Sequence, residues 1–212
     1  VVGRAETLAA LFFLAAWWCY LRGRPAAGAA AFLAAALCKE SAFTFLAVLP
    51  LSDYIARRNW DRRTFARYAP FAAAAAVALG LRYIVLGGFA PLAISAAANP
   101  LAGAGALERL LTATLVFGKY LWLLVFPLPL SADYSFNQIP VVRNPWSPSV
   151  LFAAAVVAGA AWAARRSRPL FFCGVFFLAT FSLTSNFLRP IGTILAERLL
   201  YLPSMGFTCA LA

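Results

Sequence analysis

Acidic residues are the scarcest reactive side chains in this sequence, so each can be considered individually. The 212 residues include seven Asp and Glu against 18 Lys and Arg. Five of the seven have a basic residue close by: Glu6 with Arg4, Glu40 with Lys39, Glu108 with Arg109, Asp133 with Arg143, and Glu197 with Arg198. The other two, Asp53 and Asp61, stand at or within an arginine-rich segment, and we interpret them as solvated partners of its arginines.

A carboxylate near a cation suits one class of reaction particularly well. The carboxylate can take a proton from a hydroxyl group, and the cation can stabilise a phosphate leaving group. Together they fit glycosyl transfer from a sugar carried on a lipid phosphate. The same residue types would also line the ion path of a transporter, so the residues alone leave an enzyme and a transporter equally open.

Other chemistries have little support in the composition. Histidine is absent, which excludes histidine-based catalytic triads and most zinc sites. The four cysteines (Cys19, Cys38, Cys173 and Cys209) lie in or beside apolar runs and form no CxxC pair. We expect them to be small buried side chains, and the sequence predicts no metal and no certain cofactor.

The composition indicates a protein that is solvated by lipid. Hydrophobic residues make up 64% of the chain, charged residues make up 12%, and the mean hydropathy is +0.82, whereas soluble domains are about 25% charged. A spanning helix needs about 20 mostly apolar residues. Apolar runs cover residues 8–21, 26–37, 41–55, 68–89, 110–126, 150–164, 170–183 and 205–212. The sequence therefore predicts an all-α, polytopic transmembrane bundle, with residues 1–212 forming a single transmembrane domain.

The arginines predict an orientation for these runs. The formal net charge is +11, and the arginines cluster between apolar runs. This is the positive-inside pattern of membrane proteins, and we prefer it to nucleic-acid binding as the explanation of the positive charge. Arg22 with Arg24, the 57–67 segment and the 165–168 segment should be cytoplasmic. The five acid–base groups then fall on the other side, with Lys39 and Glu40 at the tip of a hairpin.

One apolar run does not fit this alternation. If residues 68–89 lead out and residues 150–164 lead back in, residues 110–126 cannot simply cross once. We expect that run to be re-entrant or interfacial, or one of the other assignments to be wrong. Lys119 in its middle fits a helix that does not face lipid at mid-depth.

The two ends of the sequence suggest an internal piece of a longer protein. Residue 1 is Val, and the last residues lie within an apolar run. The first apolar run lacks the basic leader and the small-residue cleavage site of a signal peptide. We expect the chain to be a fragment truncated at both ends.

Five local motifs occur in a characteristic order. They are VVGRAE at 1–6, LCKES at 37–41, NP at 99–100, LSADYS at 130–135 and ILAERLLYLPSMGF at 194–207. Together they resemble the transmembrane and TPR-repeat-containing protein O-mannosyltransferase family, including its bacterial relatives. The resemblance spans nearly the whole chain, and the first and last motifs are its most specific parts.

The resemblance implies a fold and an activity. Such enzymes are GT-C-type glycosyltransferases, with a helical membrane domain and an active site on the extracytoplasmic face. They take mannose from a polyprenyl- or dolichyl-phosphate carrier and transfer it to a Ser or Thr hydroxyl of an acceptor protein. TPR repeats are expected downstream. The family's main acidic motif would lie before Val1, so the fragment alone should be inactive.

The candidate site residues follow from the motifs and their charges. We expect catalytic roles for Glu6, Asp133 and Glu197, donor-phosphate contacts for Arg4, Lys39 and Arg198, and further site positions at Glu40, Tyr134 and Tyr201. Simpler roles stay open for each motif: a helix-start ion pair for Arg4 with Glu6, a solvated turn at residues 39–40, an ordinary polar loop at residues 133–134, and structural anchoring at residues 197–198. Arg82 and Lys119 should snorkel to the membrane surface or pair.

Two rival functions remain open. A transporter or flippase of lipid-linked saccharides would use the same charges along its path and would show inverted repeats, of which none is visible. A membrane scaffold for attached repeats would use the charges for packing. Membrane lipid, a lipid-linked sugar donor and an acceptor protein are the expected partners. Richness in Ala, Arg and Gly favours a bacterial inner membrane, with the endoplasmic reticulum membrane as the alternative.

Overall fold

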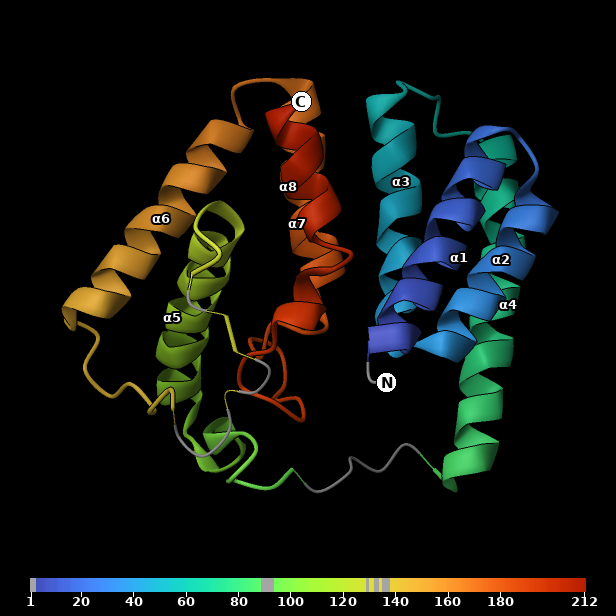
Figure 1. The fold of residues 1–212 in the computed structure, drawn as a ribbon. Helices are drawn as coiled ribbons and strands as arrows, with labels where there is room; N and C mark the ends of the chain where they lie inside the picture. The colour runs from blue at the N-terminus through green and yellow to red at the C-terminus, as the bar shows by residue number, and fades with distance from the viewer. Residues whose placement is uncertain (1–2, 89–93, 129, 132–133, 135–137) are drawn as a thin grey trace. The chain divides into compact units, whose positions relative to one another are not determined.

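The computed structural model describes residues 3–88, 94–128, 130–131, 134 and 138–212, and these residues are helical or irregular, without strands (Figure 1). The α-helices are α1 (Gly3–Leu21), α2 (Pro25–Cys38), α3 (Phe45–Ile55), α4 (Arg62–Leu86), α5 (Ala106–Val125), α6 (Pro148–Ala164), α7 (Arg168–Ser182) and α8 (Ser204–Leu211). Three 3-10 helices accompany them: η1 (Glu40–Thr44), η2 (Pro100–Gly103) and η3 (Glu197–Leu200). The all-α prediction is confirmed. The chain divides into unit 1, Val1–Pro91, and unit 2, Leu92–Ala212, so the single transmembrane domain stays a prediction.

Among the described helices, α4 has the length and the apolar composition needed to cross a membrane. It has 25 residues, and only 22% of its most apolar stretch is buried within the protein. The 14 residues of α2 and the 11 residues of α3 are too few for an untilted span of about 30 Å. The structure therefore supports one spanning helix by length and composition, and the polytopic bundle remains a proposal.

The helix α4 begins earlier than the hydropathy predicted. Asp61 caps it, because the Asp61 carboxylate accepts a hydrogen bond from the Thr64 backbone N–H at 2.8 Å. This bond lowers the pKa of the Asp61 carboxyl, so the cap stays ionised near neutral pH. Arg62, Arg63 and Arg67, expected in a loop, therefore lie in the first two turns of the helix. The helix ends where Gly87 adopts a left-handed conformation with φ of 69°, which glycine adopts without steric cost.

The core of unit 1 is built from one phenylalanine of each helix. Phe13, Phe32, Phe45 and Phe71 come from α1, α2, α3 and α4, and all four are fully buried. The Phe45 ring centre lies 5.0 Å from that of Phe13, 5.6 Å from Phe32 and 5.4 Å from Phe71. Such aromatic contacts add to the free energy gained from burial alone, so the first residue of α3 anchors this helix to the other three although it is the shortest of the four.

Polar contacts show which helix ends meet in unit 1. Lys39, at the end of α2, pairs with Glu6 near the start of α1, while Glu40 pairs with Arg82 near the end of α4. The Lys39–Glu40 turn therefore lies at one end, as the hairpin prediction requires. The arginine-rich turns after α1 and α3 belong to the opposite end.

In unit 2, α5 and α6 pack closely because a glycine faces an alanine. A Cβ atom added at Gly118 would lie 2.5 Å from the Ala153 Cβ and 2.8 Å from its Cα. Small residues allow helices to approach this closely in membrane proteins. The position thus explains why glycine stands in the middle of α5 despite its low helix propensity.

The chain returns to the start of α5 before α6 begins. The Val142 N–H donates to Thr112 Oγ1 at 2.9 Å, and Arg143 Nε donates to Glu108 at 3.1 Å. Thr112 and Glu108 lie in the first two turns of α5, so α5 and α6 begin at the same end of unit 2 (Figure 1). A return of the chain to the same end is compatible with a re-entrant segment, and the re-entrant or interfacial interpretation of residues 110–126 stays a prediction.

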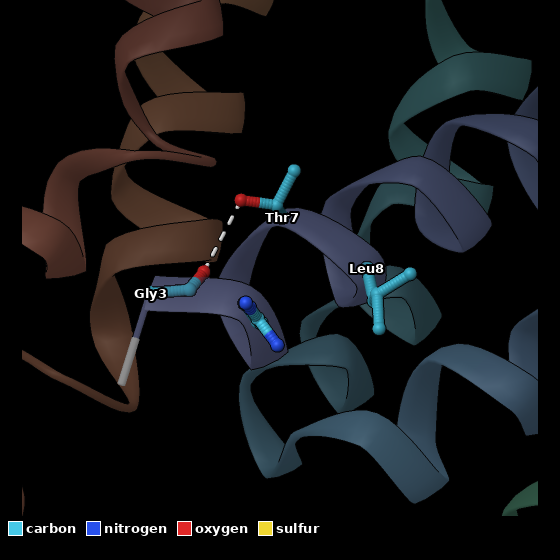
Figure 2. Close-up of a pocket in the computed structure, with 4 residues that line it drawn as sticks. Gly3, Thr7 and Leu8 are labelled. Carbon is cyan, nitrogen blue, oxygen red and sulfur yellow. Dashed lines mark hydrogen bonds between the residues drawn. The ribbon is translucent and has the colours of Figure 1, made fainter. Parts of the chain in front are cut away.

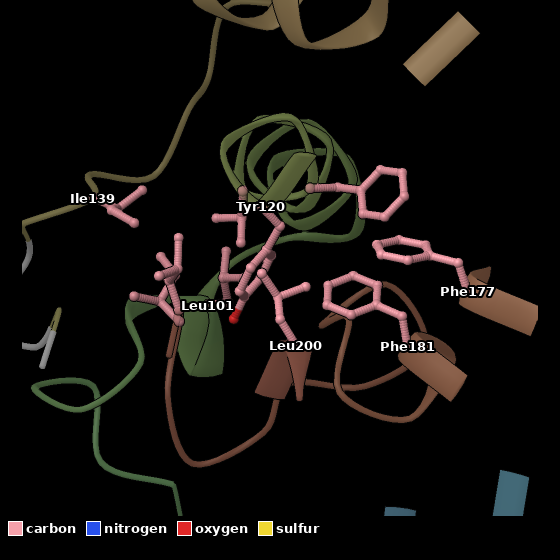
Figure 3. Packing of buried hydrophobic residues seen from close by; sticks show 10 residues of the cluster. Leu101, Tyr120, Ile139, Phe177, Phe181 and Leu200 are labelled. Carbon is pink, nitrogen blue, oxygen red and sulfur yellow. The ribbon is translucent and has the colours of Figure 1, made fainter. Parts of the chain in front are cut away.

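A hydrophobic cluster joins segments of unit 2 that are distant in sequence (Figure 3). Leu101, Tyr120, Ile139, Phe181 and Leu200 all contribute buried side chains to it. The Tyr120 and Phe181 ring centres lie 5.0 Å apart in an edge-to-face arrangement. Burial of these groups holds α5, α7 and the irregular segments before and after them together.

Two buried asparagines connect the irregular segments of unit 2. Asn99 Nδ2 donates to Asn186 Oδ1 at 2.9 Å and to the Ile191 carbonyl at 2.8 Å, while Asn99 Oδ1 accepts from the Leu101 N–H at 3.0 Å. Asn186 Nδ2 donates to the Ile194 carbonyl at 3.1 Å. Both residues are almost completely buried. The Asn-Pro motif is therefore a structural connection to the segment that precedes η3.

Substitution of Gly118 by Ala should lower the free energy of unfolding by about 1–3 kcal/mol, because the new methyl group must push α5 away from α6. Thermal unfolding of the purified protein measures the change. Gly159→Ala in α6 is the matched control, because nothing lies within 4 Å of the added Cβ. Alanine has the higher helix propensity, so the free energy of unfolding of this variant should be unchanged or higher by up to about 1 kcal/mol. Equal effects of the two substitutions would contradict the close packing of α5 on α6.

Substitution of Asn99 by Ala should lower the free energy of unfolding by about 2–4 kcal/mol, since it leaves several buried polar groups without their partner. Asn144→Ala provides the control, because Asn144 is exposed and its side chain accepts a hydrogen bond from the Trp146 N–H. That control should change stability by less than about 0.5 kcal/mol. A fully stable Asn99→Ala protein would show that the buried amides do not hold the segment.

Candidate functional site

The predicted site residues of unit 1 form two neighbouring ion pairs. Glu6 pairs with Lys39, and both side chains are largely buried. Glu40 pairs with Arg82 at 3.2 Å in a more exposed position. Arg82 therefore pairs, as its sequence context suggested. Because Lys39 already neutralises Glu6, it would contact a donor phosphate only by sharing or exchanging this partner.

Arg4 does not form the helix-start ion pair with Glu6 that the sequence left open. It lines a shallow hollow on the first two turns of α1 together with Gly3, Thr7 and Leu8 (Figure 2). The Thr7 hydroxyl donates to the Gly3 carbonyl at 3.1 Å. The Arg4 side chain is exposed, and no described carboxylate lies within ion-pair distance of it. Arg4 is thus available to an anion at this end of unit 1.

The predicted site residues of unit 2 meet around one carboxylate. Glu197 Oε1 accepts a hydrogen bond from the Ser131 N–H at 2.8 Å and another from the Tyr134 hydroxyl at 2.9 Å. Desolvation by burial, followed by the hydrogen bond to Glu197, raises the pKa of the Tyr134 hydroxyl, so it remains a donor at neutral pH. The LSADYS and LAERLLYLPS motifs are therefore joined directly through Glu197.

Glu197 is positioned by α5. The Tyr120 hydroxyl accepts a hydrogen bond from the Ala196 N–H at 2.8 Å and lies 3.3 Å from the Ala196 carbonyl. Leu195 and Ala196 are buried, so the backbone directly before η3 is fixed. The Asn186 amide fixes the chain slightly further upstream at Ile194. Together these contacts set the direction in which Glu197 leaves the backbone.

Two further predicted residues follow Glu197 in the sequence, one within η3 and one directly after it. Arg198 and Tyr201 are both exposed, and Arg198 has no ion pair with any described carboxylate. Asp133, the third predicted catalytic acid, lies outside the described residues. The arrangement offers a held carboxylate, whose Oε2 accepts no hydrogen bond from the described residues, and the residue that follows it in the sequence carries an exposed guanidinium group.

The Glu108–Arg143 pair lies apart from this carboxylate. Twelve positions separate Glu108 from Tyr120 on α5, roughly 18 Å along the helix axis. Glu108 Oε2 also accepts from the Gly105 N–H at 3.3 Å, within a capping box at the start of α5. Glu108 therefore caps α5 and fixes the return of the chain, and it does not belong to the Glu197 site.

Sequence reasoning missed the most buried of the carboxylates that the structure describes. Asp53, expected to be solvated, is only 1% exposed. Its Oδ2 accepts from the Tyr20 and Tyr68 hydroxyls, and its Oδ1 accepts from Arg58 at 2.9 Å. The position of Asp53 inside an apolar run, with tyrosines at the matching ends of two neighbouring runs, was the available signal. This network lies at the arginine-rich end of unit 1.

Comparisons with known proteins identify the relatives of this chain. Residues 88–161 match the family model described as protein O-mannosyl-transferase TMTC, DUF1736. The chain is 26% identical to protein O-mannosyl-transferase Tmtc3 of Drosophila melanogaster over 100% of its own length and 29% of that protein. It is 28% identical to a protein O-mannosyl-transferase of Caenorhabditis elegans over 98% of the chain and 30% of the relative. It is also 32% identical to Tmtc2 of Drosophila melanogaster, over 82% of the chain and 21% of the relative.

The chain thus spans less than a third of these relatives, and no solved structure matches it. The matched region of the family model contains α5 and the return of the chain to Arg143. The alignments with the first two relatives extend over nearly all of the motifs on which the resemblance rested. That resemblance is confirmed, and the chain is a relative of the TMTC protein O-mannosyl-transferase family.

Proposed function

We propose that this chain is part of a membrane glycosyltransferase of GT-C type that moves mannose from a polyprenyl- or dolichyl-phosphate carrier to a Ser or Thr hydroxyl of an acceptor protein. The observation that carries this proposal is the Glu197 carboxylate, which Ser131 and Tyr134 hold and which the exposed Arg198 follows in the sequence. The names of the relatives, which are protein O-mannosyl-transferases, support this reaction class. They give no support to a transporter or flippase.

The proposed reaction exchanges one bond at the sugar for another. The acceptor hydroxyl oxygen bonds to C1 of the mannosyl group, and the bond between C1 and the phosphate oxygen breaks with its electron pair left on the phosphate. The hydroxyl proton passes to a carboxylate, which acts as general base. Arg198 would neutralise the charge that develops on the phosphate, because a guanidinium fork matches phosphate oxygens.

Glu197 is the best placed of the described acids for the proton transfer. One of its oxygens is fixed by two donors, so the other is held in a defined direction. Glu6 is already paired with Lys39, so we assign it a supporting role. In the same proposal Arg4, Lys39, Glu40 and Tyr201 contribute to binding of the donor, and Asp133 is a further acid.

The cellular location follows from two considerations. The exposed, apolar helix α4 supports an integral membrane protein. The composition favours a bacterial inner membrane, whereas the animal origin of the relatives fits the endoplasmic reticulum membrane. Either location places the site on the extracytoplasmic face in this proposal, with membrane lipid and the acceptor protein as partners.

Substitution of Glu197 by Gln should lower kcat roughly a hundredfold, since the amide keeps the size of the side chain and cannot accept the proton. Tyr134→Phe should lower kcat about tenfold, because it removes one of the two groups that hold the carboxylate.

The assay is mannosyl transfer from a polyprenyl-phosphate mannose to an acceptor peptide by the full-length protein in liposomes. Glu108→Gln is the matched control and should retain activity. An unchanged kcat in Glu197→Gln would remove Glu197 from the reaction.

Substitution of Arg198 by Gln should raise the KM for the lipid-phosphate donor about tenfold or more, because a charge-assisted contact is lost. The KM of Arg198→Lys for the donor should lie between those of the unchanged protein and Arg198→Gln, since lysine keeps the charge and loses the two-pronged guanidinium geometry. Arg189→Gln removes the same charge from another exposed position of unit 2 and should leave the KM for the donor unchanged. A normal KM for the donor in Arg198→Gln would argue against phosphate contact by this residue.

A further inference from the structure

One end of unit 1 carries a large excess of positive charge. Residues 20–24 and 53–68 contain seven arginines and two aspartates, which leaves a formal charge of +5. The arginines are Arg22, Arg24, Arg57, Arg58, Arg62, Arg63 and Arg67. Both aspartates are engaged within the protein, Asp53 in the buried network with two tyrosines and Arg58, and Asp61 as the cap of α4.

The buried Asp53 network holds these arginines together. Tyr20 is the penultimate residue of α1, and Tyr68 lies in the second turn of α4, so their shared acceptor joins the two helices to the end of α3. A second contact, in which Trp17 Nε1 donates to Ser52 Oγ at 2.9 Å, strengthens the junction. The turn with Arg22 and Arg24 and the 57–67 segment are thereby fixed at the same end.

Most of these arginines have no anionic partner within the described protein. Arg22, Arg24, Arg57, Arg62 and Arg63 are exposed, and none of them lies within ion-pair distance of a described carboxylate. Arg58 alone is paired, with Asp53. Like charges held at one end repel each other, and bound anions would relieve this repulsion. Guanidinium groups bind phosphate oxygens especially well.

Exposed aromatic side chains surround the same arginines. Trp18 is 56% exposed, Trp60 is 52% exposed and Phe65 is 57% exposed. The Arg22 guanidinium lies over the Trp18 ring at 5.2 Å, and the Trp60 and Phe65 rings are 6.3 Å apart. Tryptophan side chains are enriched at the level of lipid headgroups, and the candidate spanning helix α4 begins at Arg62 within this surface. Binding of a soluble anion would explain why the arginines are exposed together, but it would not explain why aromatic side chains are exposed among them.

We infer that the arginine- and tryptophan-bearing end of unit 1 binds the phosphate groups of anionic phospholipids at the bilayer surface, with the aromatic side chains inserted among the headgroups. Polybasic segments next to spanning helices attract anionic lipid in this way. This lipid is a structural partner and not the sugar donor, so the inference is independent of the proposed transferase activity. The buried Asp53 carboxylate contributes to lipid binding indirectly, because it holds together the three helix ends that carry the arginines.

The test is thermal unfolding of the full-length protein in a neutral detergent. Added phosphatidylglycerol should raise the melting temperature by several degrees at low salt and by less at high salt, because salt screens exposed charges. Phosphatidylcholine with the same acyl chains should raise it far less. R62Q/R63Q and R22Q/R24Q should each lose at least half of the shift produced by phosphatidylglycerol.

Matched variants separate lipid binding from other effects. R109Q/R189Q removes the same charge from unit 2 and should keep the full shift. R62K/R63K retains the charge and should keep most of it, which distinguishes loss of binding from a damaged fold. Equal shifts with the two lipids, equal loss in R109Q/R189Q, or an equal shift with soluble glycerol phosphate would each overturn the assignment of an anionic lipid.

Discussion

A buried polar group in so apolar a protein must find its partners inside the protein, and both units are organised around this constraint. In unit 1 the Asp53 carboxylate is surrounded by Tyr20, Tyr68 and Arg58. In unit 2 the Asn99 and Asn186 amides satisfy each other and the backbone around them. An unsatisfied buried group costs more than an average hydrogen bond contributes, so these few contacts fix positions that hydrophobic packing alone would leave free.

The same constraint links the fold of unit 2 to its candidate site. Where the structure describes the chain between α5 and α6, it is irregular and not helical, so its backbone needs partners from elsewhere. Thr112 supplies one at Val142, and Glu197 supplies another at Ser131. Glu197 is therefore both a support for the returning segment and the carboxylate of the proposed site. A site built in this way is held rigidly, which is what a positioned general base requires.

Charge is separated along unit 1, and the two ends differ in how it is balanced. At one end, Glu6 with Lys39 and Glu40 with Arg82 form local ion pairs. At the other end, the arginines greatly outnumber the carboxylates. The first arrangement leaves Arg4 as an exposed cation beside two local ion pairs, which suits the proposed binding of an anionic substrate. The second suits a surface whose balancing anions come from the lipid.

The sequence by itself determined where the helices lie, how charge is distributed between them and which family the chain resembles. These features depend on local hydrophobic runs, caps and motifs, so the runs at residues 26–37 and 150–164 matched α2 and α6 to within two residues at each end. It also predicted that Lys39 and Glu40 form the tip of a hairpin. The start of α4 was misplaced because the Asp61 cap outweighs the polarity of the arginines that follow it.

Only the tertiary structure decided which polar groups meet. Neighbours in sequence suggested Glu6 with Arg4 and a solvated Asp53, whereas Glu6 pairs with Lys39 and Asp53 is buried between two tyrosines. The contact of Tyr134 with Glu197 and the close approach at Gly118 were likewise invisible. The physical reason is that helix position follows from local periodicity, whereas the choice of a polar partner depends on how distant helices pack and on how much water they exclude.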